Sequence, residues 1–498
     1  MTDVNLQGLS DVLKKRKAKN YECAVLHWEM KTTVPTSSVE FIINAIKNVE
    51  KELFSRDMNN EILYALEGVI GSCCYDGLTY NEKYCIQKAY NNLKRLMNVP
   101  DEIISQYSEA KLIAQNVWLE AKKKNDYLLF KPKLEKLINL TKQYYSYIRT
   151  NNQCLYDEML GSYEPGTTMQ LLDSLFDRIK NGLKATIEGL PKQDDKINIK
   201  QYGRNVLIEI SRYLLNYIGF DNDRSVLGFY PHGTTMGLNR NDVRIAFDDS
   251  RSIYDHVCTV IHEGGHGIFE QNIGDDAERF SVLDINGIGT LVQNMALHES
   301  QSRFFENMLG RDINFWTPIY DDVRTILGLN ESIDEFVGHL NYAHPSLIRT
   351  EADDLTYCMH IILRYELEKA IFNDDVDLDL LPKMWNDKMI EYLGIKVDSD
   401  AHGILQDVHW SIGSFGYFPS YLLGSMFGAM LLECINDKLG NIGTILKNGD
   451  IKRITKFLMD NIHKNGGCYS IYELSNTICG HNLSAESLIG YLTNKYGK

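Results

Sequence analysis

The sequence has few of the features that mark secreted, membrane-bound or nucleic-acid-binding proteins. It has 498 residues, a net charge of −15 and no long basic run, so binding to nucleic acid through a broad phosphate-facing surface is not expected. The N-terminal residues are polar and lack the apolar core of a signal peptide. The ten cysteines include no C-x-x-C pair. These features favour free thiols in a reducing compartment, and we expect a cytoplasmic protein.

Proline is also scarce, with ten residues in 498, which is less than half of its average usage. No linker rich in glycine, serine or proline divides the chain, and no internal repeat is present. Long stretches have helical periodicity. We therefore predict a single, mostly α-helical domain over residues 1–498, with a helical part to about residue 200 and the site-bearing part from about residue 201. The predicted elements are amphipathic helices at 38–70, 80–124, 130–150 and 168–190, and a strand at 241–247.

One uncharged run, residues 411–432, is long enough to cross a bilayer. It is interrupted by Pro419 and contains four glycines. Because proline is tolerated in the first turn of a helix, we expect a buried segment that becomes a core helix near Pro419. No membrane partner is expected.

The strongest chemical signal is the stretch His262-Glu263-Gly264-Gly265-His266. A helix places positions i and i+4 on one face, so the two histidines can share one metal ion. Glu263 lies beside that face, where it could accept a proton from water. The alternative is a helix with two solvated or core histidines. Because catalytic zinc usually takes three protein ligands, a third ligand is expected elsewhere in the chain.

Glu299 is the candidate for the third ligand among the nearby acids, which are Glu270, Asp275, Asp276, Glu278, Asp284, Glu299 and Glu306. It lies on the apolar face of a helix predicted within residues 290–310, where a bare carboxylate would be costly to bury. A cation resolves that cost, but an ion pair with Arg303, four residues on, is an alternative. The residues that define the predicted face are Val292, Met295, Ser302 and Leu309.

Three glycines, Gly264, Gly265 and Gly267, follow Glu263 closely. Each glycine disfavours a helix interior by about 1 kcal/mol. The missing side chains would let another backbone approach the metal-binding face. That backbone is either a neighbouring helix or a peptide substrate, and the sequence leaves both open.

These residues belong to an ordered set of motifs that resembles the carboxypeptidase Taq-type metallocarboxypeptidases. H-E-x-x-H alone is shared by many metallopeptidases, whereas the ordered set is far more specific. The motifs extend over most of the chain and are Trp28-Glu29-x-x-Thr32-x-x-Pro35, LYDEMLGSYEPGTT (155–168), DVRI (242–245), HEGGH (262–266), HESQSR (298–303), IRTEADDLTY (348–357), GILQDVHW (403–410) and GYFPSYLLG (416–424).

The resemblance implies a helical metallocarboxypeptidase with a deep substrate groove, which acts as a homodimer on peptides with a free C-terminus. It also implies one Zn²⁺ per chain, with Co²⁺ as the other candidate metal. The site residues that it implies are the zinc ligands His262, His266 and Glu299, the general base Glu263, the carboxylate-binding Arg349 and Arg244, and the oxyanion donors His409 and Tyr421.

The last four of these residues each have a structural alternative. Arg349 is followed closely by three acidic residues, and Arg244 lies beside Asp242, so each arginine could serve a structural ion pair. His409 and Tyr421 could be ordinary packing residues. Only the resemblance favours a role in substrate binding or catalysis for these four.

The chain departs from the family pattern at three places. His232-Gly233-Thr234 stands where the family has H-P-F, Ala246 replaces the threonine of D-x-R-x-T, and the gap between His262 and Glu299 is longer. These changes leave the metal ligands and the base intact. They bear on which terminal residue the enzyme prefers.

Two other functions remain open from the sequence. The same zinc site could serve an oligopeptidase that cuts internal bonds, or a non-catalytic scaffold with a structural zinc. The presence of Glu263 argues against the scaffold, because a structural zinc site does not need a base.

Overall fold

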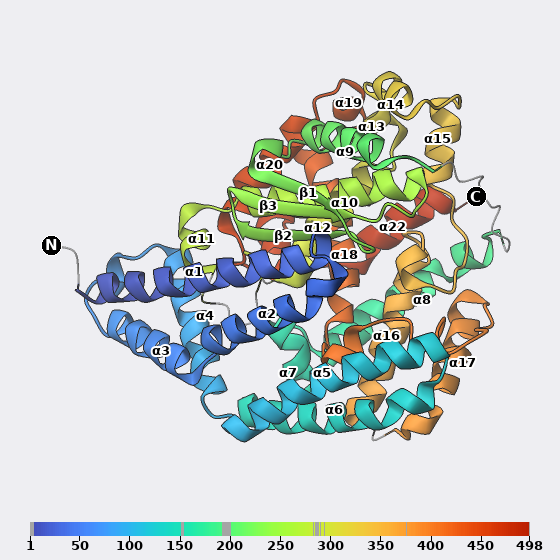
Figure 1. The fold of residues 1–498 in the computed structure, drawn as a ribbon. Helices are drawn as coiled ribbons and strands as arrows, with labels where there is room; N and C mark the ends of the chain where they lie inside the picture. Colours follow the sequence, from blue (N-terminus) through green and yellow to red (C-terminus); the bar gives the residue numbers. More distant parts are fainter. Residues whose placement is uncertain are drawn as a thin grey trace. The chain divides into compact units, whose positions relative to one another are not determined.

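The computed structural model describes residues 4–150, 154–191, 201–281, 283, 288, 290–292, 294–374 and 376–497. In these residues the chain is mostly α-helical with one three-stranded sheet (Figure 1), which confirms the predicted fold class. The chain forms two compact units, each built from segments that are distant in sequence. The first unit consists of Met1–Lys94, Asn198–Leu340 and Leu431–His481, and the second of Arg95–Ile197, Asn341–Met430 and Asn482–Lys498.

The first unit contains the sheet and the helices around it. Its strands are β1 (Ser225–Phe229), β2 (Thr234–Asn239) and β3 (Asp242–Phe247). Its helices are α1 (Val4–Thr32), α2 (Val39–Leu53), α3 (Arg56–Ile70), α4 (Tyr80–Leu96), α9 (Arg204–Ile218), α10 (Ile253–Gln271), α11 (Asp275–Ser281), α12 (Met295–Arg303), α13 (Ile313–Trp316), α14 (Tyr320–Leu327), α15 (Ile333–Leu340), α19 (Ile442–Lys447), α20 (Ile451–Asn461) and α21 (Ile471–Leu474).

In its described residues the second unit is helical throughout, and α5 and α6 form a long hairpin in it (Figure 1). Its helices are α5 (Asp101–Lys124), α6 (Tyr127–Ile148), α7 (Leu155–Tyr163), α8 (Met169–Glu188), α16 (Tyr357–Asn373), α17 (Leu381–Leu393) and α22 (Ala485–Tyr496). Helix α18 (Phe418–Leu439) begins in the second unit and continues into the first.

Two of the predicted helices are each divided in the structure. The segment 38–70 forms α2 and α3, because Ser55 caps α3 by accepting a hydrogen bond from the backbone N–H of Met58. The segment 80–124 forms α4 and α5, and α5 begins directly after Pro100. Proline disfavours the helical conformation in the residue before it, so one continuous helix is excluded there. The other two predicted helices are confirmed as α6 and α8.

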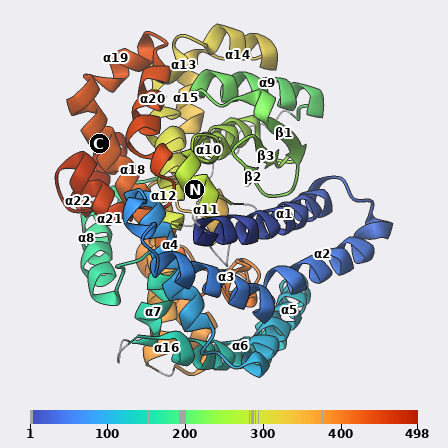
Figure 2. The ribbon, with the colours of Figure 1, turned by 90° about the vertical axis from the view of Figure 1, so that its left-hand side faces the viewer.

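The sheet has the strand order β1-β3-β2, with β1 parallel and β2 antiparallel to β3. The central strand β3 confirms the strand predicted at 241–247, and its Val243, Ile245 and Phe247 are fully buried. The edge strands β1 and β2 were not predicted. Helix α10 packs against β2 and β3 (Figure 2), so the sheet supports the helix that carries His262 and His266.

The uncharged run around Pro419 is a core helix rather than a membrane span. Pro419 lies in the first turn of α18, as expected. In the most apolar 18-residue window of this helix, 83% of the residues are buried. The helix is apolar because it lies inside the protein.

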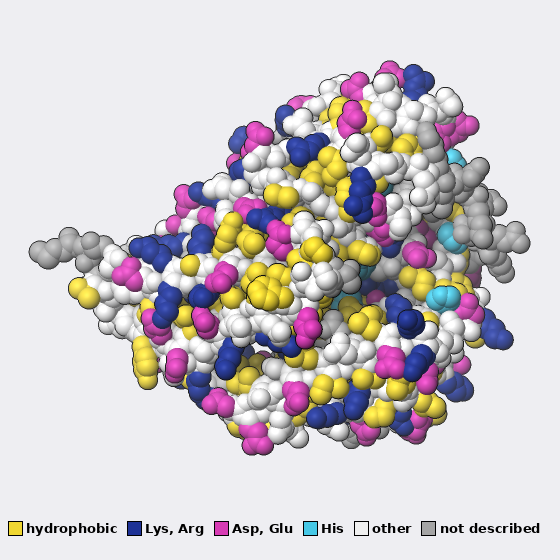
Figure 3. All heavy atoms as spheres, in the orientation of Figure 1, with side chains coloured by type: hydrophobic (Ala, Val, Ile, Leu, Met, Phe, Trp, Pro, Cys, Tyr) yellow, Lys and Arg dark blue, Asp and Glu magenta, His cyan; other side chains and the backbone are white. Residues whose placement is uncertain are grey.

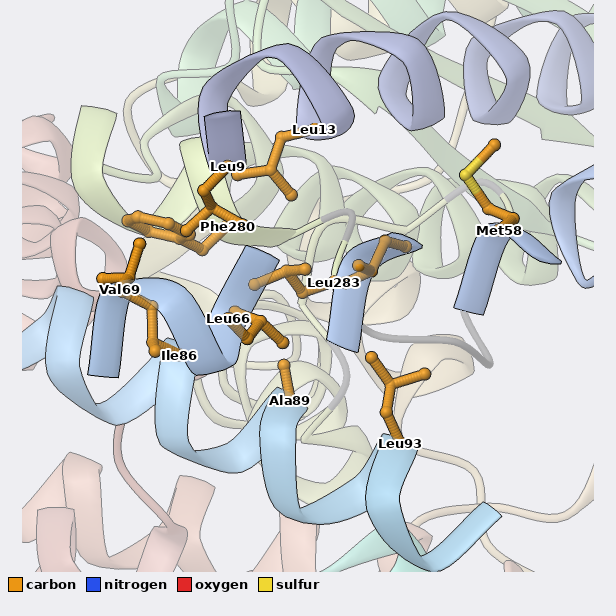
Figure 4. Close-up of a cluster of buried hydrophobic side chains, with 11 residues drawn as sticks. Leu9, Leu13, Met58, Leu66, Val69, Ile86, Ala89, Leu93, Phe280 and Leu283 are labelled. Carbon is orange, nitrogen blue, oxygen red and sulfur yellow. The ribbon is translucent and has the colours of Figure 1, made fainter. Parts of the chain in front are cut away.

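A cluster of buried apolar side chains joins α1, α3, α4 and α11 in the first unit (Figure 4). Leu9, Leu66, Ile86 and Phe280 are among its members, and each is at most 2% exposed. This packing fixes α4 against α11. On the face drawn in Figure 3, acidic and basic side chains are interspersed over the surface.

Candidate metal centre

Helix α10 holds both histidines of the H-E-x-x-H motif. Ser252 caps its N-terminus by accepting a hydrogen bond from the N–H of Asp255. The helix runs without interruption through its glycines to Gln271. His262 and His266 therefore lie on one face, one turn apart.

Gly265 is required because the backbone of α12 lies against it. A Cβ atom at Gly265 would lie 2.7 Å from the carbonyl oxygen of Gln301 and 2.8 Å from the Cα of Ser302. Both distances are shorter than real contacts allow. The sequence left open whether a neighbouring helix or a peptide substrate approaches these glycines. At Gly265 the structure shows a neighbouring helix, α12, which carries Glu299.

Gly264 and Gly267 make room for side chains instead. A Cβ at Gly264 would lie 2.6 Å from the Cδ1 of Ile218, and one at Gly267 would lie 2.5 Å from the ring of Phe220. The three glycines therefore let α10 pack closely on two sides. This packing offsets their cost in helix stability.

Helix α12 begins later than predicted. Val292 precedes the helix, which starts at Met295, and a π-helical turn follows it from Phe304 to Leu309. The prediction that Val292 lies on the same helical face as Glu299 is therefore wrong, because Val292 lies outside the helix. The physical reason is that Glu270 binds the backbone N–H of Leu291 and the hydroxyl of Thr290, which holds this segment outside the helix.

His262, His266 and Glu299 form a group of possible metal ligands. The Oε2 atom of Glu299 lies 3.4 Å from Nε2 of His266 and 3.8 Å from Nε2 of His262. The three ligand atoms lie within 4.8 Å of one another. Two ligands about 2.1 Å from a tetrahedral zinc ion are about 3.4 Å apart. The donor set thus suits a metal ion, and the distance between Glu299 and His266 equals this spacing.

Glu299 also forms the ion pair with Arg303 that was considered as the alternative. Nε of Arg303 donates to Oε1 of Glu299 over 2.6 Å, while Oε2 faces the histidines. Burial would raise the pKa of Glu299, but Arg303 and His262 hold this pKa well below its usual range. One carboxylate can therefore pair with Arg303 through Oε1 and offer Oε2 to a metal ion, for which the anionic form is required.

The second ring nitrogen of each metal-site histidine is held by a neighbouring side chain. Nδ1 of His262 lies 2.9 Å from Oε2 of Glu306. Nδ1 of His266 lies 2.6 Å from Nδ1 of His298, whose Nε2 lies 2.8 Å from Oε1 of Glu270. These contacts orient both rings so that Nε2 faces the metal position. Burial, and then His298, lower the pKa of His266 to about 3, which keeps its imidazole neutral and able to bind a metal.

Sequence reasoning assigned no role to His298, although it lies inside the HESQSR motif. Its position directly before Glu299 was the available signal. Glu270 and Glu306 were noted only as nearby acids, and the structure shows them as supports of the two histidine rings.

We expect His298→Ala to weaken metal binding by about 10- to 100-fold, because loss of a ligand's hydrogen-bond partner typically has this effect. Competition with a chromogenic chelator would measure the affinity. His256→Ala is the matched control, since His256 is a buried histidine of α10, the helix that carries His266, and its Nε2 contacts the hydroxyl of Ser211. Equal weakening in both variants would show that the loss comes from general destabilisation and not from His266.

Glu263 is buried next to the ligand group. The hydroxyl of Thr235 donates a 2.6 Å hydrogen bond to its Oε2 atom. Burial raises the pKa of Glu263 above its usual value. A Cβ at Gly233 would lie 2.8 Å from Oε1. Gly233, which stands where the family's H-P-F motif has proline, therefore leaves space beside the carboxylate of Glu263.

A second group of possible ligands in the described residues, Cys23, His27 and Glu50, fits a metal less well. Cys23 is fully buried in an apolar cluster with Ile46 and Val49. Burial, with Glu50 nearby, raises the pKa of its thiol to about 12. Because the thiolate is the form that binds a metal, we read this group as a core cysteine beside a histidine–glutamate pair.

Arg244 lies on β3 and is engaged with its neighbour Asp242. Its Nε and Nη2 atoms each donate to this carboxylate over 2.9 Å. The guanidinium also lies 5.9 Å from the ring centre of Trp28. The ion pair considered from the sequence is therefore present, and the predicted assistance in substrate binding remains a prediction.

Arg349, in the second unit, shares one carboxylate with a second arginine. Its Nε and Nη2 atoms lie 2.9 Å from Oδ1 of Asp407, while Nε of Arg364 donates to Oδ2 over 2.7 Å. Nη1 of Arg349 donates to the hydroxyl of Tyr357. The two guanidinium groups hold the pKa of Asp407 far below its usual range against the effect of burial. This buried group of two cations and one anion carries an excess positive charge.

His409 and Tyr421 lie beside this arginine in the second unit. Nε2 of His409 is 3.3 Å from the hydroxyl of Tyr421. The ring centre of Tyr421 is 5.1 Å from the guanidinium carbon of Arg349. The structure thus brings three of the predicted residues together in the second unit. In the first unit it brings His262, His266, Glu299 and Glu263 together.

Comparison with known proteins identifies the family. The profile described as carboxypeptidase Taq (M32) metallopeptidase matches residues 9–496. Carboxypeptidase 1 of Bacillus subtilis (strain 168) is 34% identical over 494 residues, which cover 98% of this chain and 97% of that protein. The BsuCP crystal structure is similar with a TM-score of 0.85 and 33% identity, covering 99% of both chains. The Apo-Mg structure of Pyrococcus furiosus carboxypeptidase has a TM-score of 0.89 and 26% identity, covering 100% of this chain and 99% of that one. The chain therefore belongs to the carboxypeptidase Taq (M32) family and is a metallocarboxypeptidase.

Proposed function

We propose that this enzyme releases single residues from the free C-termini of peptides, with zinc as its metal and Glu263 as the general base. The observation that supports this proposal is the set formed by His262, His266 and Glu299 next to a buried Glu263. Two imidazoles and one carboxylate suit zinc and leave a fourth position for water or substrate. Cobalt accepts the same donors.

A bound zinc ion supplies the Lewis acidity that makes water a nucleophile near neutral pH. Glu263 accepts the proton of the attacking water and later delivers it to the departing amine. Since Oε2 already accepts the hydrogen bond of Thr235, Oε1 is the atom that takes the proton. Its pKa, raised by burial, makes the carboxylate a stronger base than an exposed glutamate.

Arg349 receives the C-terminal carboxylate of the substrate in this proposal. A guanidinium binds a carboxylate through two parallel hydrogen bonds, and the excess positive charge around Asp407 attracts one more anion. The hydroxyl of Tyr421 and the imidazole of His409 are the donors proposed for the developing oxyanion. Arg244 is proposed only to assist binding, since Asp242 already engages it.

Digestion of one peptide as its free acid and as its C-terminal amide tests the function. We expect a ladder of single-residue losses by mass spectrometry from the free acid alone, and none after treatment with a chelator. Internal cuts in both peptides would instead establish the oligopeptidase. Absence of cleavage by zinc-loaded protein would favour the scaffold.

The same assay with the variant Arg349→Met tests whether Arg349 binds the C-terminal carboxylate of the substrate. We expect kcat/KM for the free acid to fall by about 30-fold or more, because removing one partner of a buried charge pair costs about 2–5 kcal/mol. The control is Arg178→Met, since Arg178 forms an exposed ion pair with Glu486 in the same unit. An unchanged preference for the free acid in Arg349→Met would assign the carboxylate to another residue.

We further propose that the enzyme is a cytoplasmic homodimer with one metal ion per chain, a deep substrate groove and a single domain. These properties come from the sequence and the family resemblance. Sedimentation equilibrium of the metal-loaded protein would test the dimer.

A further inference from the structure

Two thiols that play no part in the proposed reaction lie in contact in the first unit. Sγ of Cys85, on α4, is 3.4 Å from Sγ of Cys468, which lies in the loop before α21. The two residues are 383 positions apart in the chain. All ten cysteines lie in described residues and none forms a disulfide, so this pair is reduced in the structure.

Both thiols border a cavity. It is an open hollow, and its roughly 480 Å³ of empty space includes open solvent. Lys88 and Asn92 of α4, Ser281 of α11 and Leu291 also line it. Ala89, Phe280 and Leu283, which form part of its wall, belong to the apolar cluster drawn in Figure 4. Because the hollow is open to solvent and Cys85 is only half-buried, a small reagent can reach the sulfur of Cys85.

The two cysteines are not equivalent toward such a reagent. Cys85 is half-buried, whereas Cys468 is 1% exposed. Lys88 follows Cys85 by three residues on α4 and borders the same cavity, so the site has the positive charge found beside reactive cysteines. The contact with Cys85, and then burial, raise the pKa of the Cys468 thiol. Cys85 is therefore the first sulfur to react, and Cys468 the second.

We propose that Cys85 and Cys468 form a reversible disulfide by exchange with a low-molecular-weight disulfide that approaches Cys85 from the open side of this hollow. The Cys85 thiolate attacks one sulfur of the reagent, which forms a mixed disulfide and expels one thiolate. The Cys468 sulfur, after losing its proton to solvent, attacks Cys85 and expels the second thiolate. Two protein thiols are oxidised by two electrons, and the reagent is reduced to two thiols.

The packing around the pair allows this bond to form. The sulfur atoms must approach from 3.4 Å to about 2.0 Å, so the change needed is about 1.4 Å. Helix α4 is held by the apolar cluster. Cys468 follows Gly466 and Gly467, and Gly466 has a φ of +53°. We therefore assign the movement to the loop, whose glycines can adjust with little steric cost.

Peptide mapping of the full-length, metal-loaded protein tests this proposal. The protein is incubated with oxidised glutathione, alkylated without reduction, and digested with trypsin and chymotrypsin. Cleavage after Tyr469 separates Cys468 from Cys479. We expect a peptide that joins residues 85–88 to residues 465–469, two hydrogen atoms lighter than the sum of its reduced parts, and lost after treatment with dithiothreitol.

Two variants test the order in which the two cysteines react, and a third cysteine serves as an internal reference for the reagent. In Cys468→Ser, Cys85 is expected to accumulate as a glutathione adduct, and in Cys85→Ser no adduct is expected on Cys468. The exposed Cys73 reports that the reagent is active. If Cys73 reacts while Cys85 and Cys468 remain reduced, or carry separate adducts without joining, the proposal is wrong. These results do not depend on peptidase activity.

Discussion

Replacing Glu263 with glutamine is expected to lower kcat/KM by about 10²- to 10⁴-fold, which is the usual contribution of a positioned general base. The amide has the same shape and can still accept the hydrogen bond of Thr235, but it cannot take up the proton of water. Steady-state kinetics on a free-acid peptide would measure the loss. Metal analysis of the same samples should give equal metal content in variant and parent.

The matched control for this variant is Glu209→Gln. Glu209 is an exposed residue of α9 in the same unit, and its replacement should leave kcat/KM unchanged. Glu263→Gln protein with full metal content and activity within a few-fold of the parent would assign the base to another residue. Loss of metal in Glu263→Gln would mean that this carboxylate supports the ligand group instead.

Replacing Gly265 with alanine is expected to destabilise the protein and to weaken metal binding together. Because the new Cβ would meet the backbone at Gln301 and Ser302 at 2.7 and 2.8 Å, α12 must move, and Glu299 moves with it. Overpacking of this kind costs about 1–3 kcal/mol of unfolding free energy. Urea denaturation of the metal-free proteins and chelator competition of the loaded proteins would measure the two effects separately.

Gly338→Ala is the control for the effect of alanine itself. Gly338 is an exposed glycine of α15, and a Cβ there would have no atom within 4 Å. Alanine at this helical position should raise the free energy of unfolding by about 0.5–1 kcal/mol. If Gly265→Ala behaved like Gly338→Ala, the close approach of α12 would not be what holds Glu299 in place.

The candidate ligands were predictable because they depend on local rules. The spacing of His262 and His266 follows from helix geometry, and Glu299 was found from the cost of a carboxylate on an apolar helix face. Neither argument needs a partner far away in the chain. The same local reasoning also predicted β3, whose alternation is short but clear, and the start of α18 at Pro419.

What could not be predicted depends on contacts between distant segments. The role of Gly265 needs the backbone of residues 301–302, and the orientation of His266 needs His298, which is 32 residues away. The shared carboxylate of Asp407 lies 58 positions from Arg349. The edge strand β2 was missed because its pattern is interrupted by Gly237, whose missing side chain leaves room for Glu270.

The ion pair between Arg303 and Glu299 bears on the stability of the metal-free protein. Arg303 and Arg311 also contact Glu306, so the two buried carboxylates have cationic partners within the chain itself. An unpaired buried charge would otherwise cost several kcal/mol. We therefore expect a newly made chain to fold before it takes up metal, and a chain stripped of metal to be reloaded without refolding.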